Sequence, residues 1–242
     1  MSRPEFVIGN LQRTEGRLLP TSVVRQIRAR LLQSGFVLLP SDTCYSLGAL
    51  AIDKNSRHNV NAILDRKLGP ISLAFGNYLQ VRQLVEVNSA IDLLLERFTP
   101  GPITIVCKAK ESVPDDFLLH TIGSTDRTIG VRIPDSSVER DIAASTEHPL
   151  MTVAVRDFET GEAIQDFERA QEIVSIGIEQ RLKGANWAAI EADNDFHPFH
   201  STVIRISGAE KVDLLRKGDE GSAEEILDFI KKHLGWEIED LT

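Results

Sequence analysis

Residues 38–49 read LLPSDTCYSLGA, and they set the first question about this chain. The apolar residues 36–39 are typical of a buried strand, which a proline then ends. Small hydroxyl and acidic side chains follow, and Tyr45 and Leu47-Gly48 complete the stretch. Buried strands do not usually end in Ser-Asp-Thr-Cys. We therefore consider two interpretations, an ordinary turn that leaves a sheet and a loop that holds a ligand.

Composition places the chain among ordinary soluble globular proteins. Its 242 residues are 42% hydrophobic and 26% charged, which is enough to bury a substantial core. No apolar run approaches the roughly 20 residues that cross a bilayer, and the first residues lack the apolar segment of a signal peptide. Cys44 and Cys107 are the only cysteines, which argues against a disulfide framework. We expect a cytoplasmic protein with no membrane partner.

The charge balance argues against a surface that is basic all over. The formal net charge is −9, whereas nonspecific nucleic-acid binding usually relies on a basic surface. Basic residues nevertheless gather in two places, at Arg25, Arg28 and Arg30 and at Arg66 with Lys67. We interpret the first group as the solvated face of a helix rather than a nucleic-acid patch. A local basic cleft is compatible with the second.

Hydrophobic periodicity predicts a mixture of helices and strands. Helices are expected at residues 20–35, 56–67, 88–98, 166–182 and 222–235. Strands are expected at 36–39, 71–75, 103–109, 128–133 and 150–155, with a closing hairpin from 201–207 and 211–216. Because the alternation is not strict, we expect an α/β fold with a mixed, twisted sheet rather than a doubly wound parallel one. One domain is expected over residues 10–220, followed by a helical tail over 221–242.

Common nucleotide and hydrolase motifs are missing from the sequence. It has no GxxxxGK[ST] phosphate loop, no GxGxxG that opens a helix and no GxSxG nucleophile elbow. A bound nucleotide would therefore be held by scattered basic and hydroxyl groups and by backbone amides. Arg132 lies inside a predicted apolar strand, where it faces either solvent or an anion, because an unpaired buried guanidinium is costly. Arg216, taken alone, is interpreted as a surface charge.

Two further stretches have both a structural and a functional interpretation. The prolines and glycine of FTPGPIT predict a rigid turn, which would also fix the direction of Thr104 if that residue lines a cleft. DFHPFHST contains Asp195, His197 and His200, but no other ligand cluster supports a metal site. We interpret these histidines as surface loop residues and expect no metal ligands.

Taken in order, six segments resemble the YrdC-like family, the threonylcarbamoyl-adenylate synthases of tRNA modification. The segments are GFVLLPSDTCYSLGA, FTPGPITIVCKA, RTIGVRIP, HPLMTVAV, STVIRIS and LLRKGD. At these places the family has Pro-Thr-(acid)-Thr-x-(Tyr/Phe)-Gly-Leu-Gly, Trp-Pro-Gly-Pro-x-Thr, Thr-x-x-x-Arg-x-Pro, Pro-Leu before Thr-Ser-Ala-Asn, Ser-Thr-Val and Arg-x-Gly. Each motif alone is weak, but their order and spacing hold over about residues 20–220.

The resemblance implies a twisted mixed sheet with flanking helices and a large concave anion-binding cleft. The implied reaction joins L-threonine, bicarbonate and ATP, with ATP as substrate and Mg²⁺ on its phosphates, to give threonylcarbamoyl-AMP and pyrophosphate. The threonylcarbamoyl group then goes to adenosine 37 of tRNAs, so tRNA or double-stranded RNA is a further implied partner. Such a reaction needs mainly positioning and charge neutralisation.

The family motifs also imply two groups of binding residues. The threonine side would consist of Thr43, Tyr45, Arg132, Thr152 and Ser201. The nucleotide side would consist of Arg66, Lys67, Thr128 and Arg216. A threonine carboxylate and a triphosphate are both anions, so these basic side chains are natural counter-charges. No residue is assigned a catalytic role.

The chain departs from the family pattern mainly on the phosphate side. The Lys-x-Arg-Pro element appears only as DRKLGP, in which Arg66 and Lys67 are adjacent. Thr-Ser-Ala-Asn has become Thr-Val-Ala-Val at residues 152–155, so the nucleotide-contacting serine and the asparagine are both replaced. Ser46 stands for the first glycine of Gly-Leu-Gly. PSDTCYSLG and HPLMTVAV are more similar to the YciO branch of the family.

These departures leave three functional hypotheses. The first is a threonylcarbamoyl-AMP synthase or a related adenylate-forming activity. The second is a catalytically altered protein that still binds nucleotide or RNA in an anion cleft. The third is a carbamoyl-transfer module for a substrate other than tRNA, by analogy with YrdC-like domains of hydrogenase maturation proteins, although this chain supplies none of their companion domains.

Overall fold

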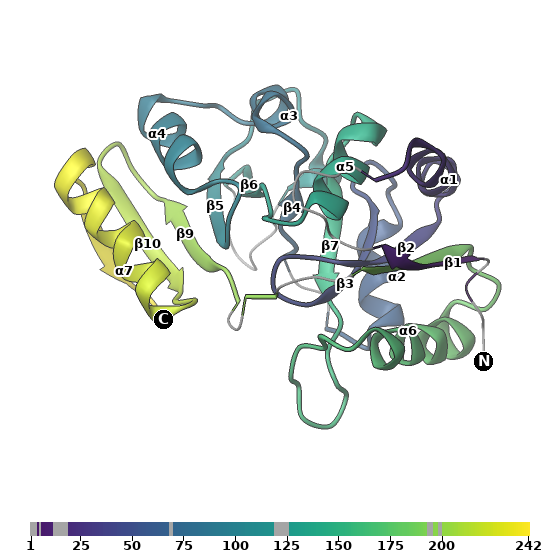
Figure 1. Cartoon of the computed structure of the whole chain (residues 1–242). Helices are drawn as coiled ribbons and strands as arrows, with labels where there is room; N and C mark the ends of the chain where they lie inside the picture. Colours follow the sequence, from purple (N-terminus) through teal and green to yellow (C-terminus); the bar gives the residue numbers. More distant parts are fainter. Residues whose placement is uncertain are drawn as a thin grey trace.

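The computed structural model describes residues 4, 6–11, 19–67, 70–118, 126–192, 196–197 and 200–242. These residues form a twisted mixed sheet with flanking helices (Figure 1). The expected α/β class with a mixed sheet is therefore confirmed.

Helices and strands follow one another without strict alternation. The strands are β1 (Phe6–Leu11), β2 (Phe36–Pro40), β3 (Tyr45–Leu50), β4 (Leu73–Ala74), β5 (Ile103–Lys108), β6 (Thr128–Arg132), β7 (Leu150–Ala154), β8 (Trp187–Ala192), β9 (Thr202–Ile206), β10 (Lys211–Arg216) and β11 (Glu237–Asp240). The helices are α1 (Thr21–Leu31), α2 (Ser56–Ile63), α3 (Tyr78–Leu84), α4 (Ser89–Phe98), α5 (Ser137–Thr146), α6 (Phe167–Arg181) and α7 (Glu220–Phe229), with single turns η1 (Asp115–Phe117) and η2 (Ile230–Leu234). Most predicted segments lie close to an observed element.

The described strands form one sheet in the order β1-β8-β2-β3-β7-β4-β6-β5-β9-β10-β11. Parallel pairs are interspersed with antiparallel ones, as in β5, which runs parallel to β9 and antiparallel to β6. The predicted hairpin of β9 and β10 is present, with Val212 opposite Ile206. This order brings motifs that are far apart in the sequence onto neighbouring strands.

The stretch LLPSDTCYSLGA forms a hairpin in the interior of the sheet. Strands β2 and β3 pair antiparallel, with Pro40 opposite Tyr45. The turn between them is closed by a hydrogen bond from the Ser41 amide to the Cys44 carbonyl (2.9 Å). Strand β3 was not among the predicted strands. That strand is buried throughout, so it lacks the polar and apolar alternation by which a half-exposed strand is recognised.

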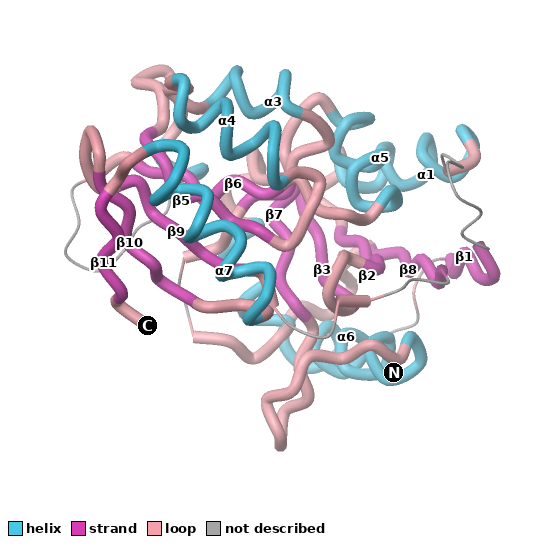
Figure 2. The backbone as a smooth tube through the Cα atoms, turned by 60° about the vertical axis from the view of Figure 1, so that its left-hand side comes forward, coloured by secondary structure: helices cyan, strands magenta, loops and turns pink. Residues whose placement is uncertain are grey.

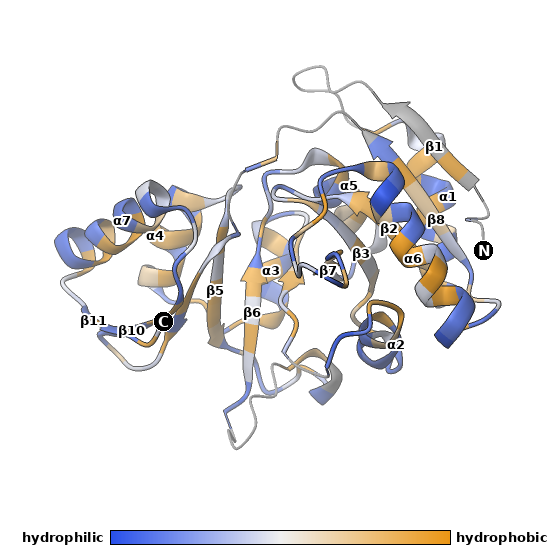
Figure 3. Ribbon diagram, turned by 90° about the horizontal axis from the view of Figure 1, so that it is seen from below, coloured by the Kyte–Doolittle hydropathy of each residue, from blue (hydrophilic) through white to orange (hydrophobic). Residues whose placement is uncertain are grey.

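Helices cover both faces of this sheet. Figures 1 and 2 show α1, α3, α4 and α5 above the strands and α6 below them. Strand β2 contributes side chains to both hydrophobic clusters, one on each face of the sheet, because successive side chains of a strand point to opposite sides. Phe36 and Leu38 belong to one cluster, and Val37 and Leu39 belong to the other. Figure 3 shows polar and apolar residues on the same helices, as expected for helices with one face on a sheet.

Two differences from the predicted elements affect the site. Helix α5 was not predicted; it begins after Ser136, whose hydroxyl accepts a hydrogen bond from the Glu139 amide (3.4 Å) as a helix cap does. The helix predicted at 56–67 ends at Ile63. Arg66 therefore lies in the connection after α2, and the helix does not set the direction of its side chain.

The C-terminal stretch also contains more than the predicted helix. Helix α7 and η2 match the helix expected at 222–235. Strand β11 then pairs in parallel with β10, and Lys211 lies opposite Glu237. Residues 237–240, which were expected to belong to a helical tail, instead extend the sheet.

Candidate functional site

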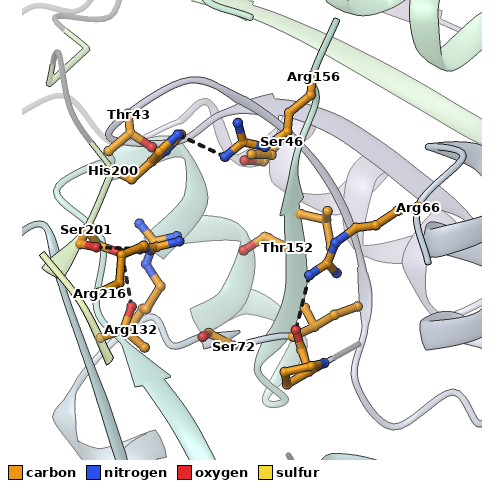
Figure 4. Close-up of a pocket in the computed structure, with 15 residues that line it drawn as sticks. Thr43, Ser46, Arg66, Ser72, Arg132, Thr152, Arg156, His200, Ser201 and Arg216 are labelled. Atoms are coloured by element: carbon orange, nitrogen blue, oxygen red, sulfur yellow. Dashed lines mark hydrogen bonds between the residues drawn. The ribbon is translucent and has the colours of Figure 1, made fainter. Parts of the chain in front are cut away.

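Two adjoining cavities lie where β3, β6, β7, β9 and β10 meet. We call the first the small cavity; it has a volume of about 180 Å³. The second, the large cavity, has a volume of about 340 Å³. Both are lined by Arg66, Pro70, Ser72 and Arg216, so the two spaces adjoin across these four residues. Figure 4 shows that polar side chains from separate segments converge on the small cavity.

Thr43 lines the small cavity from the turn between β2 and β3. The turn is buried, and the Gln165 side-chain amide holds it by donating to the Thr43 carbonyl (3.1 Å). Ser46 lines the cavity from the next strand. The stretch is therefore a sheet hairpin whose turn borders a cavity. That the turn holds a ligand stays a prediction.

Arg132 stands at the end of β6 and faces a buried carboxylate. Its guanidinium donates from Nη2 to Asp42 Oδ1 (2.6 Å), and the Asp42 side chain is fully buried while that of Arg132 is 14% exposed. Burial would lower the pKa of Arg132, but the Asp42 and Glu139 carboxylates outweigh burial and raise it. Of the two alternatives for Arg132, solvent or an anion, the structure shows an anion, the Asp42 carboxylate of the protein itself. This pair holds the guanidinium in place beside the cavity.

Glu139 of α5 is a second buried acid in this network. Its Oε2 accepts a hydrogen bond from the Ser41 hydroxyl (2.5 Å). Burial, and then the nearby Asp42 charge, raise the pKa of Glu139, although Arg132 opposes them. The buried Thr152 hydroxyl also lies close to this carboxyl and, as a hydrogen-bond partner, acts to lower its pKa.

Arg216 reaches the cavities from the end of β10. Its Nε donates to the Ser201 carbonyl (3.0 Å) and its Nη2 to the Ser201 hydroxyl (2.9 Å). The Ser201 hydroxyl also lies 3.1 Å from that of Thr104, so three strand ends are joined here. Partial burial and the charges of Arg132 and Arg156 lower the pKa of Arg216. Unlike Arg132, this guanidinium has only neutral acceptors in the part of the chain that the structure describes.

Arg156 and His200 were not assigned to the site from the sequence. Arg156 follows β7, donates from Nη1 to the Gly161 carbonyl (2.7 Å) and lies with Nη2 2.8 Å from His200 Nε2. His200 is half-buried and lines the small cavity beside Thr43, as Figure 4 shows. Its interpretation as a surface loop residue missed this position. The one available signal was that His200 directly precedes Ser201 of the Ser-Thr-Val motif.

The nine residues predicted to bind ligands fall into four groups. Thr43, Arg132, Thr152 and Ser201 line the small cavity, Thr128 lines the large one, and Arg66 and Arg216 line both. Lys67 is exposed and lines neither cavity. Tyr45 is buried beneath the turn, with its ring 5.6 Å from that of Phe167 and 5.5 Å from that of Phe196, and it also lines neither. The structure therefore brings seven of the nine to the cavities, and their roles in binding remain predictions.

The described residues contain no group of three or more His, Cys, Asp or Glu side chains that could hold a metal ion. Asp195, which was considered together with His197 and His200, lies outside the described residues. Within the same part of the chain, no helix is both long and apolar enough to cross a membrane.

The chain is similar to proteins of one family. A family model described as Sua5_yciO_yrdC, "Telomere recombination", matches residues 29–218. A putative threonylcarbamoyl-AMP synthase of Methanocaldococcus jannaschii is 28% identical over 122 residues, which cover 50% of this chain and 56% of that relative. Sequence similarity to this curated relative thus spans about half of either protein.

Two solved structures share the fold. Pyrococcus abyssi Sua5 complexed with L-threonine has a TM-score of 0.72 at 21% identity, covering 91% of this chain and 60% of that one. Escherichia coli YciO has a TM-score of 0.69 at 18% identity, covering 89% of this chain and 96% of that one. At these identities the similarity establishes the fold alone. The activity has to be argued from the residues of the site.

Proposed function

Because this chain belongs to the Sua5/YciO/YrdC family, we propose that it joins L-threonine, bicarbonate and ATP into threonylcarbamoyl-AMP and releases pyrophosphate. The observation that carries the proposal is the small polar cavity adjoining a larger one across Arg66 and Arg216. The amino acid would occupy the small cavity, and the base and ribose would occupy the large one. The phosphates would then lie between them, beside the shared guanidinium groups.

The small cavity supplies groups suited to an amino acid. Thr43 and Ser201 offer hydroxyls, and Arg132 offers a guanidinium that Asp42 already holds in position. A fixed guanidinium orients a carboxylate with little further ordering. The name of the Pyrococcus abyssi structure, a complex with L-threonine, supports threonine as this amino acid.

The proposed chemistry requires two displacements. The threonine amino nitrogen attacks the carbon of bicarbonate and water leaves, which gives a carbamate. A carbamate oxygen then attacks the α-phosphorus of ATP, and pyrophosphate leaves. Both steps depend on proximity and on neutralising negative charge, which Arg66, Arg156 and Arg216 would supply. Within the described residues no carboxylate lines the small cavity and Asp126 lines the large one, so Mg²⁺ would be held mainly by the phosphates and water.

A direct assay tests the proposal. The purified chain, incubated with L-threonine, bicarbonate and ATP, is expected to release pyrophosphate and to form a product with the mass of threonylcarbamoyl-AMP. Release should require all three substrates. Arg216→Met should lower the rate, whereas the control Arg28→Met, on the exposed side of α1, should not. Pyrophosphate release no higher than background, with threonine and with every other amino acid tried, would refute the proposal.

A second candidate is a protein that binds nucleotide or RNA in the same cavities without catalysis. It is favoured by Val153, which lines the small cavity at the serine position of the family's Thr-Ser-Ala-Asn, and by Lys67, which lies outside both cavities. Titration with tRNA and with double-stranded RNA at rising salt distinguishes the candidates. Binding that weakens steeply with salt and with charge reversal at Arg66 and Lys67 would support it, provided that no adenylate forms.

A further inference from the structure

Arg156 and His200 meet at one edge of the small cavity although they come from distant parts of the chain. Arg156 follows β7 and His200 precedes β9. Their side chains lie 2.8 Å apart, between Arg156 Nη2 and His200 Nε2. Figure 4 shows this pair at the upper edge of the cavity, with Arg216 and Arg132 below His200. Because a guanidinium can only donate, His200 Nε2 must be the acceptor, and the ring is therefore neutral.

The cavity gathers guanidinium charge that the described chain does not neutralise. Arg66 donates to the Asn61 side-chain oxygen and to the Pro70 carbonyl. Arg156 and Arg216 likewise have only carbonyl, hydroxyl and imidazole partners. Partial burial and Arg156 lower the pKa of Arg66, as expected for cations held close together. Three such groups in a chain of net charge −9 form a site for a ligand with several negative charges.

Within the described part of the chain, the charged groups that act on the His200 imidazole are all positive. Arg156 faces it from the end of β7, Arg216 from the end of β10 and Arg132 from the end of β6. Burial and these three charges lower the pKa of His200, and among the described residues no carboxylate contributes to this shift. Asp42 lies behind Arg132 and is occupied by it. An anion bound among these arginines would remove the repulsion that keeps the ring neutral.

We propose that Arg156 and His200 bind the pyrophosphate end of the nucleotide, and that His200 takes up a proton when this polyanion binds. The identity of the anion rests on the proposed function. On binding, the Arg156 guanidinium bonds to phosphate oxygens, which frees His200 Nε2 to carry a proton and to donate it in a hydrogen bond to the same ligand. The proton comes from the solvent, and no covalent bond of the ligand changes.

Proton uptake gives the site a definite pH dependence. The pKa of His200 is lowered in the free protein and rises in the complex, so the complex holds more protons. Affinity for the anion therefore increases as pH falls through the pKa of His200 in the complex. The ligand also titrates in this range, and a variant without the imidazole shows that contribution separately.

Calorimetric titration with inorganic pyrophosphate tests the inference without turnover. The full chain is titrated at about pH 7 in two buffers of different ionisation enthalpy, which gives the number of protons taken up per ligand. We expect His200→Gln to bind with less proton uptake than the wild type, and Arg156→Gln to weaken binding by about tenfold or more. The control His58→Gln, on the exposed side of α2, should match the wild type in both respects. Thermal unfolding of each variant checks that it is folded.

The possible results separate this inference from the proposed function. Equal proton uptake in His200→Gln and wild type would overturn the inference, as would unchanged affinity in a folded Arg156→Gln or no pyrophosphate binding by the wild type. If pyrophosphate binds with His200-dependent uptake but no threonylcarbamoyl-AMP forms, the proposed function fails and the anion site stands.

Discussion

Arg132 and Arg216 reach the same cavity, yet the protein supports them in opposite ways. Arg132 rests on Asp42, whose side chain is fully buried, and has Glu139 nearby. Arg216 rests on the carbonyl and hydroxyl oxygens of Ser201. The charge of Arg132 is therefore balanced by a carboxylate of the protein, whereas the charge of Arg216 has no carboxylate partner among the described residues.

This difference between Arg132 and Arg216 suits one site to two kinds of anion, a single carboxylate and a polyanion. A compensated guanidinium is held rigidly and presents little net charge, which suits the orientation of a single carboxylate. An uncompensated one attracts a polyanion and repels its neighbours until that ligand arrives. The cost of the first arrangement is that its two partners depend on each other for stability.

The largest expected effect comes from removing Arg132, with Arg216 as the comparison. Arg132→Met should lower the free energy of unfolding by about 3–5 kcal/mol, because it leaves the buried Asp42 carboxylate without its partner. Arg216→Met should change it by less than about 1 kcal/mol, because no buried charge loses a partner. Urea denaturation of both variants measures the difference. Similar losses in the two would show that the arginines are not supported differently.

A smaller, pH-dependent effect is expected at Glu139. Its pKa is raised in the folded state, so its contribution to stability is greatest below the pKa of the unfolded chain and is lost as pH rises through the folded pKa. Glu139→Gln keeps the shape and an acceptor for Ser41 but does not titrate. The stability of the wild type relative to this variant should therefore fall as pH rises.

Urea unfolding of wild type and Glu139→Gln at several pH values, from about 4.5 to 8, tests this expectation. Glu225→Gln is the control, because this carboxylate is exposed on α7 and pairs with an exposed arginine. A constant difference between wild type and Glu139→Gln would mean that Glu139 stays charged and that Arg132 has two anionic partners.

The smallest effect is expected at Tyr45, which the family resemblance placed on the ligand wall. Tyr45→Phe should leave threonine affinity within about twofold, because the ring packs on Phe167 and Phe196 and lines neither cavity. Thr43→Ala removes a hydroxyl from the small cavity and should weaken threonine binding more. Calorimetric titration with L-threonine compares the two variants. A larger loss in Tyr45→Phe would place the tyrosine in contact with the ligand.

The sequence predicted the fold class and most of the converging residues because the family motifs follow the strands that meet. Thr43, Arg132, Ser201 and Arg216 all lie at strand ends or turns, where sheet order brings them together. Tyr45 shows the limit of this reasoning. It neighbours Ser46 in β3, and successive residues of a strand face opposite sides, so a shift of one position decides which of them lines the cavity.

Other features lay beyond the sequence for physical reasons. Arg156 and His200 belong to no motif, and only the tertiary fold places their side chains together. Glu139 lies on a helix that the pattern did not predict, and its burial depends on packing against the turn that holds Ser41. Polar groups that act through buried partners leave no periodic signal, because their partners are distant in the chain.

Strand β11 has a further consequence for the behaviour of the protein in solution. It forms one margin of the described sheet, where unpaired backbone groups could template the addition of another chain. Three of its four residues are acidic, Glu237, Glu239 and Asp240, and all three are exposed. A second copy that approached this margin strand to strand would bring like charges together. These acidic side chains thus oppose edge-to-edge pairing of β11 with a second copy of the protein.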